Sequence, residues 1–244
     1  MNPIRNQEKI ASIFWNLKKA YSGLDAPVKR MPDKSPWWVL IGAVLSTRTR
    51  DNVTLEAVER LRVQAPDAHT LARLSPAEVA RVIYPVGFYR TKAKKLVTLA
   101  QKIEDEHQGQ VPDSIEELVK LPGVGRKVAN IVLAQGFGVP AIAVDTHVHR
   151  IANRLGLVRT KKPKETEERL CAIVPVRFWR EWNRLFVALG QTVCLPHKPL
   201  CPQCPLNSIC LKRKTRARKR RRDRRAGNFL HKLPSAEADA GVGQ

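Results

Sequence analysis

The chain of 244 residues has no long hydrophobic run, and its longest apolar stretch extends only from Trp37 to Leu45. A membrane-spanning helix needs about 18 or more consecutive apolar residues, so we expect no transmembrane segment. Residues 1–17 mix charged with apolar side chains and lack the uninterrupted apolar core of a secretory signal peptide. We therefore expect an intracellular, cytoplasmic protein whose thiols stay reduced.

Acidic side chains are also scarce, because 22 Asp and Glu stand against 44 Lys and Arg, a formal net charge of +22. Residues 212–225 alone carry +10, yet the rest of the chain keeps +12. A basic tail by itself fits a solvated extension or a loose anchor to a membrane surface. A body that is itself basic favours a polyanionic partner, nucleic acid first. The low-complexity tail, residues 212–244, is expected to be disordered.

No segment alternates polar and apolar residues as a β-strand does, and no unit of about 20–50 residues repeats. Apolar residues instead recur at helical spacing almost throughout, so we predict an all-α fold. Ser75, Pro76 and Glu78 form a helix-start signal, and that helix is expected to end near Gly87. Asp51 is expected to cap the helix that follows it.

The most informative stretch is residues 121–127, Leu-Pro-Gly-Val-Gly-Arg-Lys. A proline and two glycines predict a tight hairpin that presents backbone N–H groups, with Lys127 in the first turn of the next helix. Asp145 follows 18 residues later. A phosphate-holding turn beside an amine nucleophile and a carboxylate indicates chemistry on a nucleic-acid sugar. The alternative is a glycine-rich connection between helices with two solvated charges.

Four of the five cysteines lie within 17 residues, at Cys194, Cys201, Cys204 and Cys210. In an intracellular chain, thiols this close indicate a metal site rather than disulfides. Zinc ribbons usually pair two Cys-x-x-Cys knuckles and this loop has one, whereas four thiolates also hold an iron–sulfur cluster. The spacing leaves both open. Four thiolate ligands leave no position for a substrate, so we expect the metal to hold a loop rather than to catalyse.

Three motifs in register resemble the endonuclease III family of helix–hairpin–helix DNA glycosylases and abasic-site lyases. Residues 121–130 resemble its hairpin, residues 143–147 its aspartate loop, and the C-x6-C-x2-C-x5-C spacing its [4Fe–4S] loop. The resemblance covers roughly residues 7–211 and implies a two-lobed all-α fold with DNA between the lobes. The implied division is an N-terminal helix (1–28), a helical barrel lobe (29–140) with the helix–hairpin–helix at about 114–136, a cluster lobe (141–211) with its four-Cys loop (194–210), and the tail (212–244).

The resemblance implies a bifunctional enzyme of base-excision repair. It would remove oxidised pyrimidines from duplex DNA and cleave the abasic site by β-elimination through a lysine Schiff base. The family's catalytic residues map onto Lys127 and Asp145, and its DNA-holding turn onto Gly123, Gly125 and Arg126. The implied partner is double-stranded DNA with a damaged base or abasic site, bound by a monomer near the nucleoid. The implied cofactor is a [4Fe–4S] cluster, with zinc as the alternative.

Competing functions remain open. Mismatch adenine glycosylases share the hairpin and the cluster, but they usually lack the lysine and carry an acid where this chain has Leu40 to Leu45, without an acid. A non-catalytic or specialised DNA-binding paralogue would keep the scaffold and the basic tail. The joint presence of Lys127 and Asp145 favours the bifunctional enzyme.

Two loops are expected to select the base. Arg48 stands where the family commonly inserts a glutamine into the gap left by a flipped base, and a phosphate contact is its alternative role. Phe88 is the candidate wedge for the opposite strand, and a core aromatic at a helix end is its alternative. His147 resembles a family position near the active site. The preferred lesion and opposite base depend on these positions and are not set by the sequence.

Overall fold

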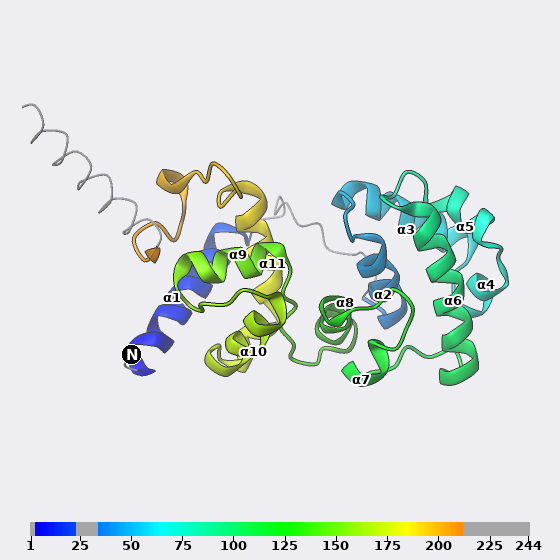
Figure 1. Cartoon of the computed structure of the whole chain (residues 1–244), viewed down its shortest axis with the longest axis horizontal. Helices are drawn as coiled ribbons and strands as arrows, with labels where there is room; N and C mark the ends of the chain where they lie inside the picture. The colour runs from blue at the N-terminus through cyan, green and yellow to red at the C-terminus, as the bar shows by residue number, and fades with distance from the viewer. Residues whose placement is uncertain (1–2, 23–33, 212–244) are drawn as a thin grey trace, which may run out of the picture.

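The computed structural model describes residues 3–22 and 34–211, so the tail 212–244 lies outside the described residues. Within these ranges the regular elements are helices and no strand occurs, which confirms the all-α prediction. Figure 1 shows two groups of helices side by side, with α1, α9, α10 and α11 in one group and α2 to α8 in the other. None of the described helices combines the length and hydropathy that crossing a membrane requires.

The elements of the described ranges follow in chain order. They are α1 (Pro3–Ala20), α2 (Pro36–Leu45), α3 (Asp51–Gln64), α4 (Ala68–Arg73), α5 (Pro76–Ile83), α6 (Tyr89–His107), α7 (Ile115–Leu118), α8 (Arg126–Ile131), a π-helix (Val132–Phe137), α9 (Thr146–Leu155), α10 (Pro163–Ile173), a 3-10 turn (Val176–Phe178), α11 (Trp179–Thr192) and a 3-10 turn (Cys201–Gln203).

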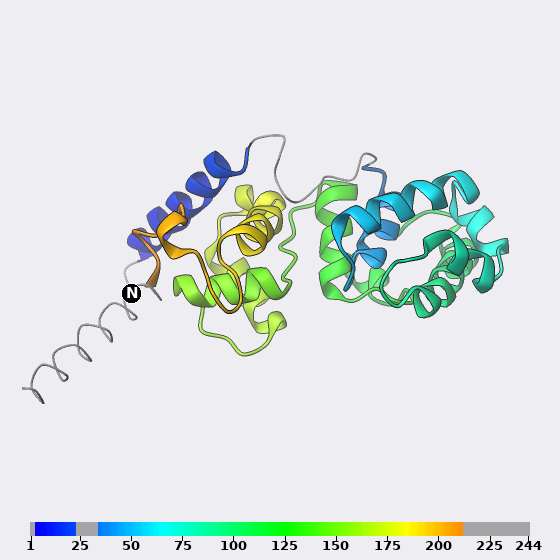
Figure 2. The ribbon, with the colours of Figure 1, turned by 90° about the horizontal axis from the view of Figure 1, so that it is seen from above.

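Helix α2 lies at the centre of the middle core, the hydrophobic cluster that runs from Trp38 to Ala141. Residues 38–45 of α2 are all buried, as an apolar segment without a polar face requires. Helix α3 and the π-helix pack against α2, while α6 packs against α4 and α5. The view from above in Figure 2 shows these helices as one group, beside the helices of the other core. The middle core thus uses one continuous stretch of chain.

The terminal core joins the first described helix to the last, because it combines residues 10–17 with residues 142–206. Ile13 and Leu17 of α1 are fully buried in it, together with Trp182 and Phe186 of α11. The rings of Trp182 and Phe186 stack with their centroids 4.7 Å apart. Such aromatic pairs bury large apolar areas, so α11 is the helix around which α1 and α9 assemble.

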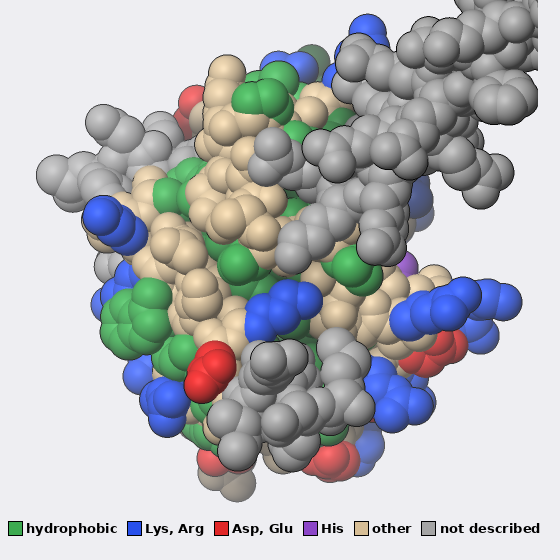
Figure 3. Space-filling view, turned by 90° about the vertical axis from the view of Figure 1, so that its left-hand side faces the viewer, with side chains coloured by type: hydrophobic (Ala, Val, Ile, Leu, Met, Phe, Trp, Pro, Cys, Tyr) green, Lys and Arg blue, Asp and Glu red, His purple; other side chains and the backbone are tan. Residues whose placement is uncertain are grey.

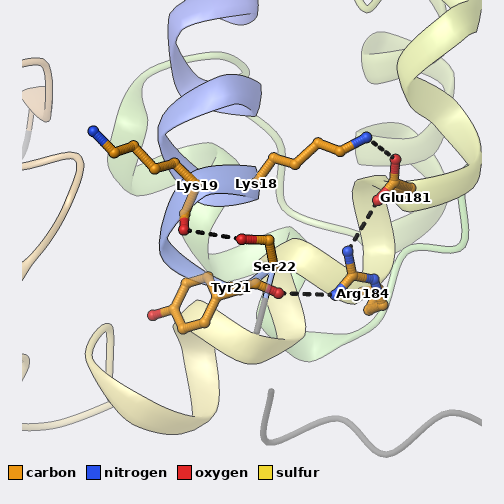
Figure 4. Close-up of polar contacts among 6 residues, drawn as sticks. All are labelled: Lys18, Lys19, Tyr21, Ser22, Glu181 and Arg184. Carbon is orange, nitrogen blue, oxygen red and sulfur yellow. Dashed lines mark hydrogen bonds and ion pairs between the residues drawn. The ribbon is translucent and has the colours of Figure 1, made fainter. Parts of the chain in front are cut away.

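Hydrogen bonds between side chains help to set the position of α1 on α11 (Figure 4). Glu181 accepts hydrogen bonds from Lys18 at 2.8 Å and from Arg184 at 2.9 Å, and Arg184 donates to the backbone carbonyl of Tyr21 at 3.3 Å. These side chains are partly exposed, so each pair contributes little energy. Their value is orientation: they set where the end of α1 meets α11.

The segment between the two cores is held by side-chain amides. Asn130 of α8 donates to the carbonyl of Ile142 at 3.2 Å, and Asn183 of α11 donates to the carbonyl of Ala143 at 2.9 Å. Buried backbone carbonyls outside a helix need such partners. One asparagine from each core therefore secures neighbouring residues of the connection, directly before Asp145.

The start of α5 confirms the sequence prediction, and its end does not. The Ser75 hydroxyl accepts from the N–H of Glu78, whose carboxylate accepts from the N–H of Ser75, a complete capping box. The helix ends at Ile83 rather than near Gly87. Pro85 is the reason, because the residue before a proline disfavours the helical region, and Tyr84 accordingly has ψ 136°.

Replacing Ser75 by alanine should lower the free energy of unfolding by about 1 kcal/mol, because the first turn of α5 loses its side-chain acceptor. Urea unfolding followed by circular dichroism measures the change. Ser75→Thr keeps the acceptor and is the matched control. An equal loss in both variants would contradict the capping role.

Candidate active site

The hairpin places Lys127 at the start of α8. Gly123 has φ 86°, in the left-handed region that favours glycine. Gly125 is the residue before α8, and no heavy atom lies within 4 Å of the position that a Cβ would take there. The backbone at Gly125 is therefore open to the approach of a ligand. Lys127, the second residue of α8, follows at once, as the sequence predicts.

Lys127 is partly buried, and no described residue accepts a hydrogen bond from its amine. Burial lowers the pKa of Lys127 below its ordinary value, because removal from water disfavours the charged form. The carboxylates of Asp145 and Asp51 oppose that shift. A lysine with a lowered pKa has a larger fraction of neutral amine, the form that acts as a nucleophile.

Asp145 is the residue before α9 and caps that helix. Its Oδ1 accepts from the N–H of Val148 at 2.8 Å. No described donor binds its second oxygen. The negative charge of Asp145 raises the pKa of both Lys127 and His147. The structure thus brings Asp145, at the edge of the terminal core, near Lys127 of the middle core.

Asp51 is a second carboxylate at this site, and its predicted role as a helix cap is wrong. Arg50 occupies the N-cap position of α3, since its carbonyl accepts the first helical bond from Thr54, and Asp51 is already helical. The charge of Asp51 acts on Lys127 and on His147. The sequence carries no signal for this, because 76 positions separate Asp51 from Lys127.

Arg126 turns toward the terminal core. Its Nη2 lies 2.6 Å from Oε1 of Glu167 on α10, and this hydrogen bond raises the pKa of Arg126. Glu167 is buried, 7% exposed, whereas the Arg126 side chain is 47% exposed. Sequence reasoning missed Glu167 and assigned Arg126 to DNA. The guanidinium joins α8 to α10 and braces the helix that carries Lys127, while its contact with DNA stays a prediction.

His147 lies in the first turn of α9 against Gly190 of α11. A Cβ on Gly190 would overlap the imidazole ring, so glycine makes room for it. Burial lowers the pKa of His147, and the nearby charge of Arg150 adds to this. The imidazole is therefore neutral at physiological pH. His149 has a structural contact, because its Nδ1 lies 2.6 Å from Oγ1 of Thr166.

Arg48 and Phe88 lie on neighbouring loops and face each other. The guanidinium carbon of Arg48 is 5.5 Å from the centroid of the Phe88 ring, a cation–π contact. Phe88 is 62% exposed, so its alternative role as a core aromatic is wrong. Both residues have left-handed backbones, with φ 52° for Arg48 and 59° for Phe88. Such angles cost energy for residues other than glycine and persist only where the surrounding structure holds them.

The four-Cys loop folds back onto α9. Arg154 donates to the carbonyl of Leu195 at 2.7 Å, to that of Pro196 at 2.6 Å and to Sγ of Cys194 at 3.3 Å. Burial raises the pKa of Cys204, and the charges of Cys194, Cys210 and Cys201 raise it further, so these three thiols lie close enough to act on Cys204. All five cysteines of the chain are described and free of disulfides. No three His, Cys, Asp or Glu within residues 3–22 and 34–211 come close enough to hold a single metal ion.

Comparison with known proteins identifies the family. Residues 41–175 match the model of the HhH-GPD superfamily base excision DNA repair protein. Endonuclease III of Thermotoga maritima is 46% identical over 187 residues, which are 75% of this chain and 88% of that protein. The chain belongs to the endonuclease III family.

Further similar proteins support the assignment to the endonuclease III family. Endonuclease III-like protein 1 of Bos taurus is 39% identical over 80% of this chain and 68% of that protein. The structure of a trapped endonuclease III–DNA covalent intermediate matches with TM-score 0.77 and 33% identity, over 86% of this chain and 98% of that one. A thermostable thymine-DNA glycosylase matches with TM-score 0.74 over 86% of this chain and 97% of that one, but its 21% identity shows the shared fold alone.

Asp145→Asn should lower the pKa of Lys127 further, because the variant removes a negative charge that stabilises the ammonium form. Asparagine still caps a helix, so α9 should keep its start. NMR titration of the lysine side chains measures the shift. Asp113→Asn is the control, since this exposed carboxylate is not among the groups that act on Lys127. A Lys127 pKa that stays in place or rises in Asp145→Asn would contradict the assignment.

Proposed function

We propose that this protein is a DNA glycosylase and abasic-site lyase of base excision repair that acts as a monomer on duplex DNA. Its substrates are damaged pyrimidines, the oxidised ones above all. One observation carries the proposal: a lysine of lowered pKa, without a described hydrogen-bond acceptor, stands directly after a glycine hairpin and near two carboxylates. Membership of the endonuclease III family and the likeness to its DNA complex support it.

In the proposed reaction the neutral amine of Lys127 attacks C1′ of the damaged nucleotide. The glycosidic bond breaks, its electron pair leaves with the base, and the base takes up a proton. The sugar ring opens to an imine between Lys127 and C1′. Loss of a proton from C2′ then breaks the bond between C3′ and its oxygen, which releases the 3′ phosphate. Water finally hydrolyses the imine and frees Lys127.

The carboxylates have different tasks in this scheme. Asp145 is held rigidly by the N–H of Val148, so its charge is fixed where positive charge develops at C1′. Its second oxygen is available to move a proton. Asp51 is a further negative charge that acts on Lys127. Both raise the pKa of Lys127 while burial lowers it, and the balance sets the pH at which the amine becomes neutral.

The proposed DNA path runs along the side where α8 meets the start of α9, between the lobe of residues 29–140 and the lobe formed by residues 1–28 with 141–211. The amides of Gly123 and Gly125 would hold the backbone, while Arg48 and Phe88 would enter the base stack. His147 lies at the same junction. Figure 3 shows the end of the molecule that carries α1, where Lys and Arg side chains outnumber acidic ones, in line with a net charge of +22.

We also propose that Cys194, Cys201, Cys204 and Cys210 hold a [4Fe–4S] cluster. The chemistry of the donor set supports this proposal, because four free thiols lie on one loop and the charges of three of them raise the pKa of Cys204. When bound, the cluster would cross-link a loop that buries little apolar surface besides Leu206. Arg154 holds the same loop through its carbonyls.

Borohydride reduction should trap a covalent adduct between the protein and an abasic duplex. Lys127→Ala should reduce trapping by about 10³-fold or more, as loss of a nucleophile does. The control is Lys102→Ala, on α6, where the lysine pairs with Glu106 at 3.3 Å. If the wild-type protein forms no adduct, the lyase proposal is wrong. Equal trapping by Lys127→Ala and wild type would mean that another amine is the nucleophile.

Cys204→Ser should lose the iron and acid-labile sulfide that the wild-type protein contains, because it removes one of four cluster ligands. Cys171→Ser, in α10 and outside the loop, should keep both. Elemental analysis and visible absorption of the purified proteins measure the outcome. A colourless wild-type protein with one zinc ion per chain would replace the cluster by the zinc alternative.

A further inference from the structure

We infer that Lys92 and Thr49 are positioning residues that lock the Arg48 loop (residues 46–50) and the Phe88 loop (residues 84–88) into one rigid wedge for extruding a base from duplex DNA. The inference rests on the proposed function and deepens it, because it concerns how the damaged base reaches Lys127. Neither Lys92 nor Thr49 was singled out by sequence patterns.

The Arg48 loop begins where α2 ends, and Lys92 completes that end. The last carbonyls of a helix lack partners within it. Ser46 Oγ donates to the carbonyl of Ala43 and Thr47 Oγ1 to that of Val44, each at 2.9 Å. The carbonyl of Leu45 receives the ammonium of Lys92 at 2.7 Å. A cation there also offsets the negative end of the helix dipole.

Lys92 reaches further into the loop than the helix end. Its ammonium donates to the carbonyl of Thr47 at 2.6 Å and to the hydroxyl of Thr49 at 3.1 Å. The residue is 6% exposed, and burial lowers its pKa to about 8, so the ammonium form prevails at neutral pH. A buried ammonium that loses its acceptors is costly. The loop is therefore held in the one arrangement that presents these oxygens.

The same lysine is tied to the Phe88 loop. Phe88 is the residue before α6, and the N–H of Lys92 donates to its carbonyl at 3.0 Å, the first helical bond of α6. One residue thus contacts both loops, with its backbone on the Phe88 loop and its side chain on the Arg48 loop. A shift of either loop would strain the other through Lys92.

Thr49 makes a second, direct bond between the loops. Its hydroxyl accepts from the N–H of Gly87 at 3.2 Å as well as from Lys92. The backbones approach so closely here that a Cβ on Gly87 would overlap the carbonyl oxygen of Arg48. The hydroxyl of Thr49 is therefore the point at which both loops and Lys92 meet.

The locked geometry explains the two left-handed residues. Arg48 and Phe88 hold unfavourable backbone angles at the tips of the two loops, and surrounding bonds must over-determine such conformations. Two loops that are already ordered bind DNA more tightly, because they lose less conformational entropy when they enter the base stack. In the described part of the chain neither Lys92 nor Thr49 bonds to Lys127 or Asp145, so their effect must act through the wedge.

The test uses the full-length protein and Thr49→Val, which keeps the shape of the side chain and removes the hydroxyl. Thr49→Ser restores the hydroxyl. Thr98→Val is the matched control, because Thr98 is exposed and donates only to Lys94 of its own helix. Single-turnover excision of an oxidised pyrimidine from duplex DNA reports on base extrusion. Borohydride trapping at a preformed abasic site reports on the chemistry without a base to extrude.

Thr49→Val should slow excision by about tenfold, the effect of one lost hydrogen bond to a charged group. Trapping at the abasic site should fall much less, while Thr49→Ser and Thr98→Val should match wild type in both assays. Of these three variants, only Thr49→Val should exchange the amide hydrogen of Gly87 faster. Lys92→Met should also slow excision more than trapping at the abasic site. If Lys92→Met fails to fold, the result for Thr49→Val decides whether the inference holds.

Excision and Gly87 exchange at wild-type rates in Thr49→Val would overturn the inference. Equal losses of excision and of abasic-site trapping would overturn it as well, since they would place Thr49 in the chemistry or in overall stability. Failure of the wild-type protein to trap abasic DNA is a different result, because it refutes the proposed function. In that case the hydrogen-exchange rate of Gly87 still tests whether Thr49 holds the two loops together.

Discussion

The removal of Lys127 from water is the physical constraint on which the site depends. An amine buried without an acceptor among the described residues loses stability in its charged form, and its pKa falls. The two carboxylates that oppose this shift, Asp145 and Asp51, come from different segments of the chain. Arg126 and Glu167 brace the start of α8, and the cap of α9 sets the nearby carboxylate of Asp145. The fold thus holds apart from water a group that elsewhere on the surface would be an ordinary solvated cation.

Helices with strong local signals were predictable from the sequence. The capping box at Ser75, the all-apolar α2 and the N-cap at Asp145 act within a few residues, so local chemistry decides them. The short helix α4 was missed, because six residues are too few to show periodicity. The end of α5 differs from the prediction because Pro85 ends the helix before the chain reaches Gly87.

The residues of the candidate site fall into two groups: those with a local sequence signal and those placed by contacts with distant segments. Lys127 and Asp145 could be assigned because each stands beside a local motif, a hairpin for one and a helix start for the other. Asp51, Glu167 and Lys92 could not, since each acquires its role from a contact with a distant segment. In the sequence Lys92 is one of several lysines on a charged helix. Its 6% exposure in the structure distinguishes it from the others.

The terminal core consists of two distant pieces of chain, residues 10–17 and residues 142–206. The middle core is continuous and can close as soon as its last residues leave the ribosome. Helix α1 is made first, but the residues that it contacts are made much later. They are Leu155 at the end of α9, Phe178 of the 3-10 turn, and Trp182, Phe186 and Glu181 of α11. The apolar face of α1 therefore stays unburied during most of synthesis. The packing of α1 on α11 therefore has to follow synthesis of the helices that carry Lys127 and of the two loops beside it.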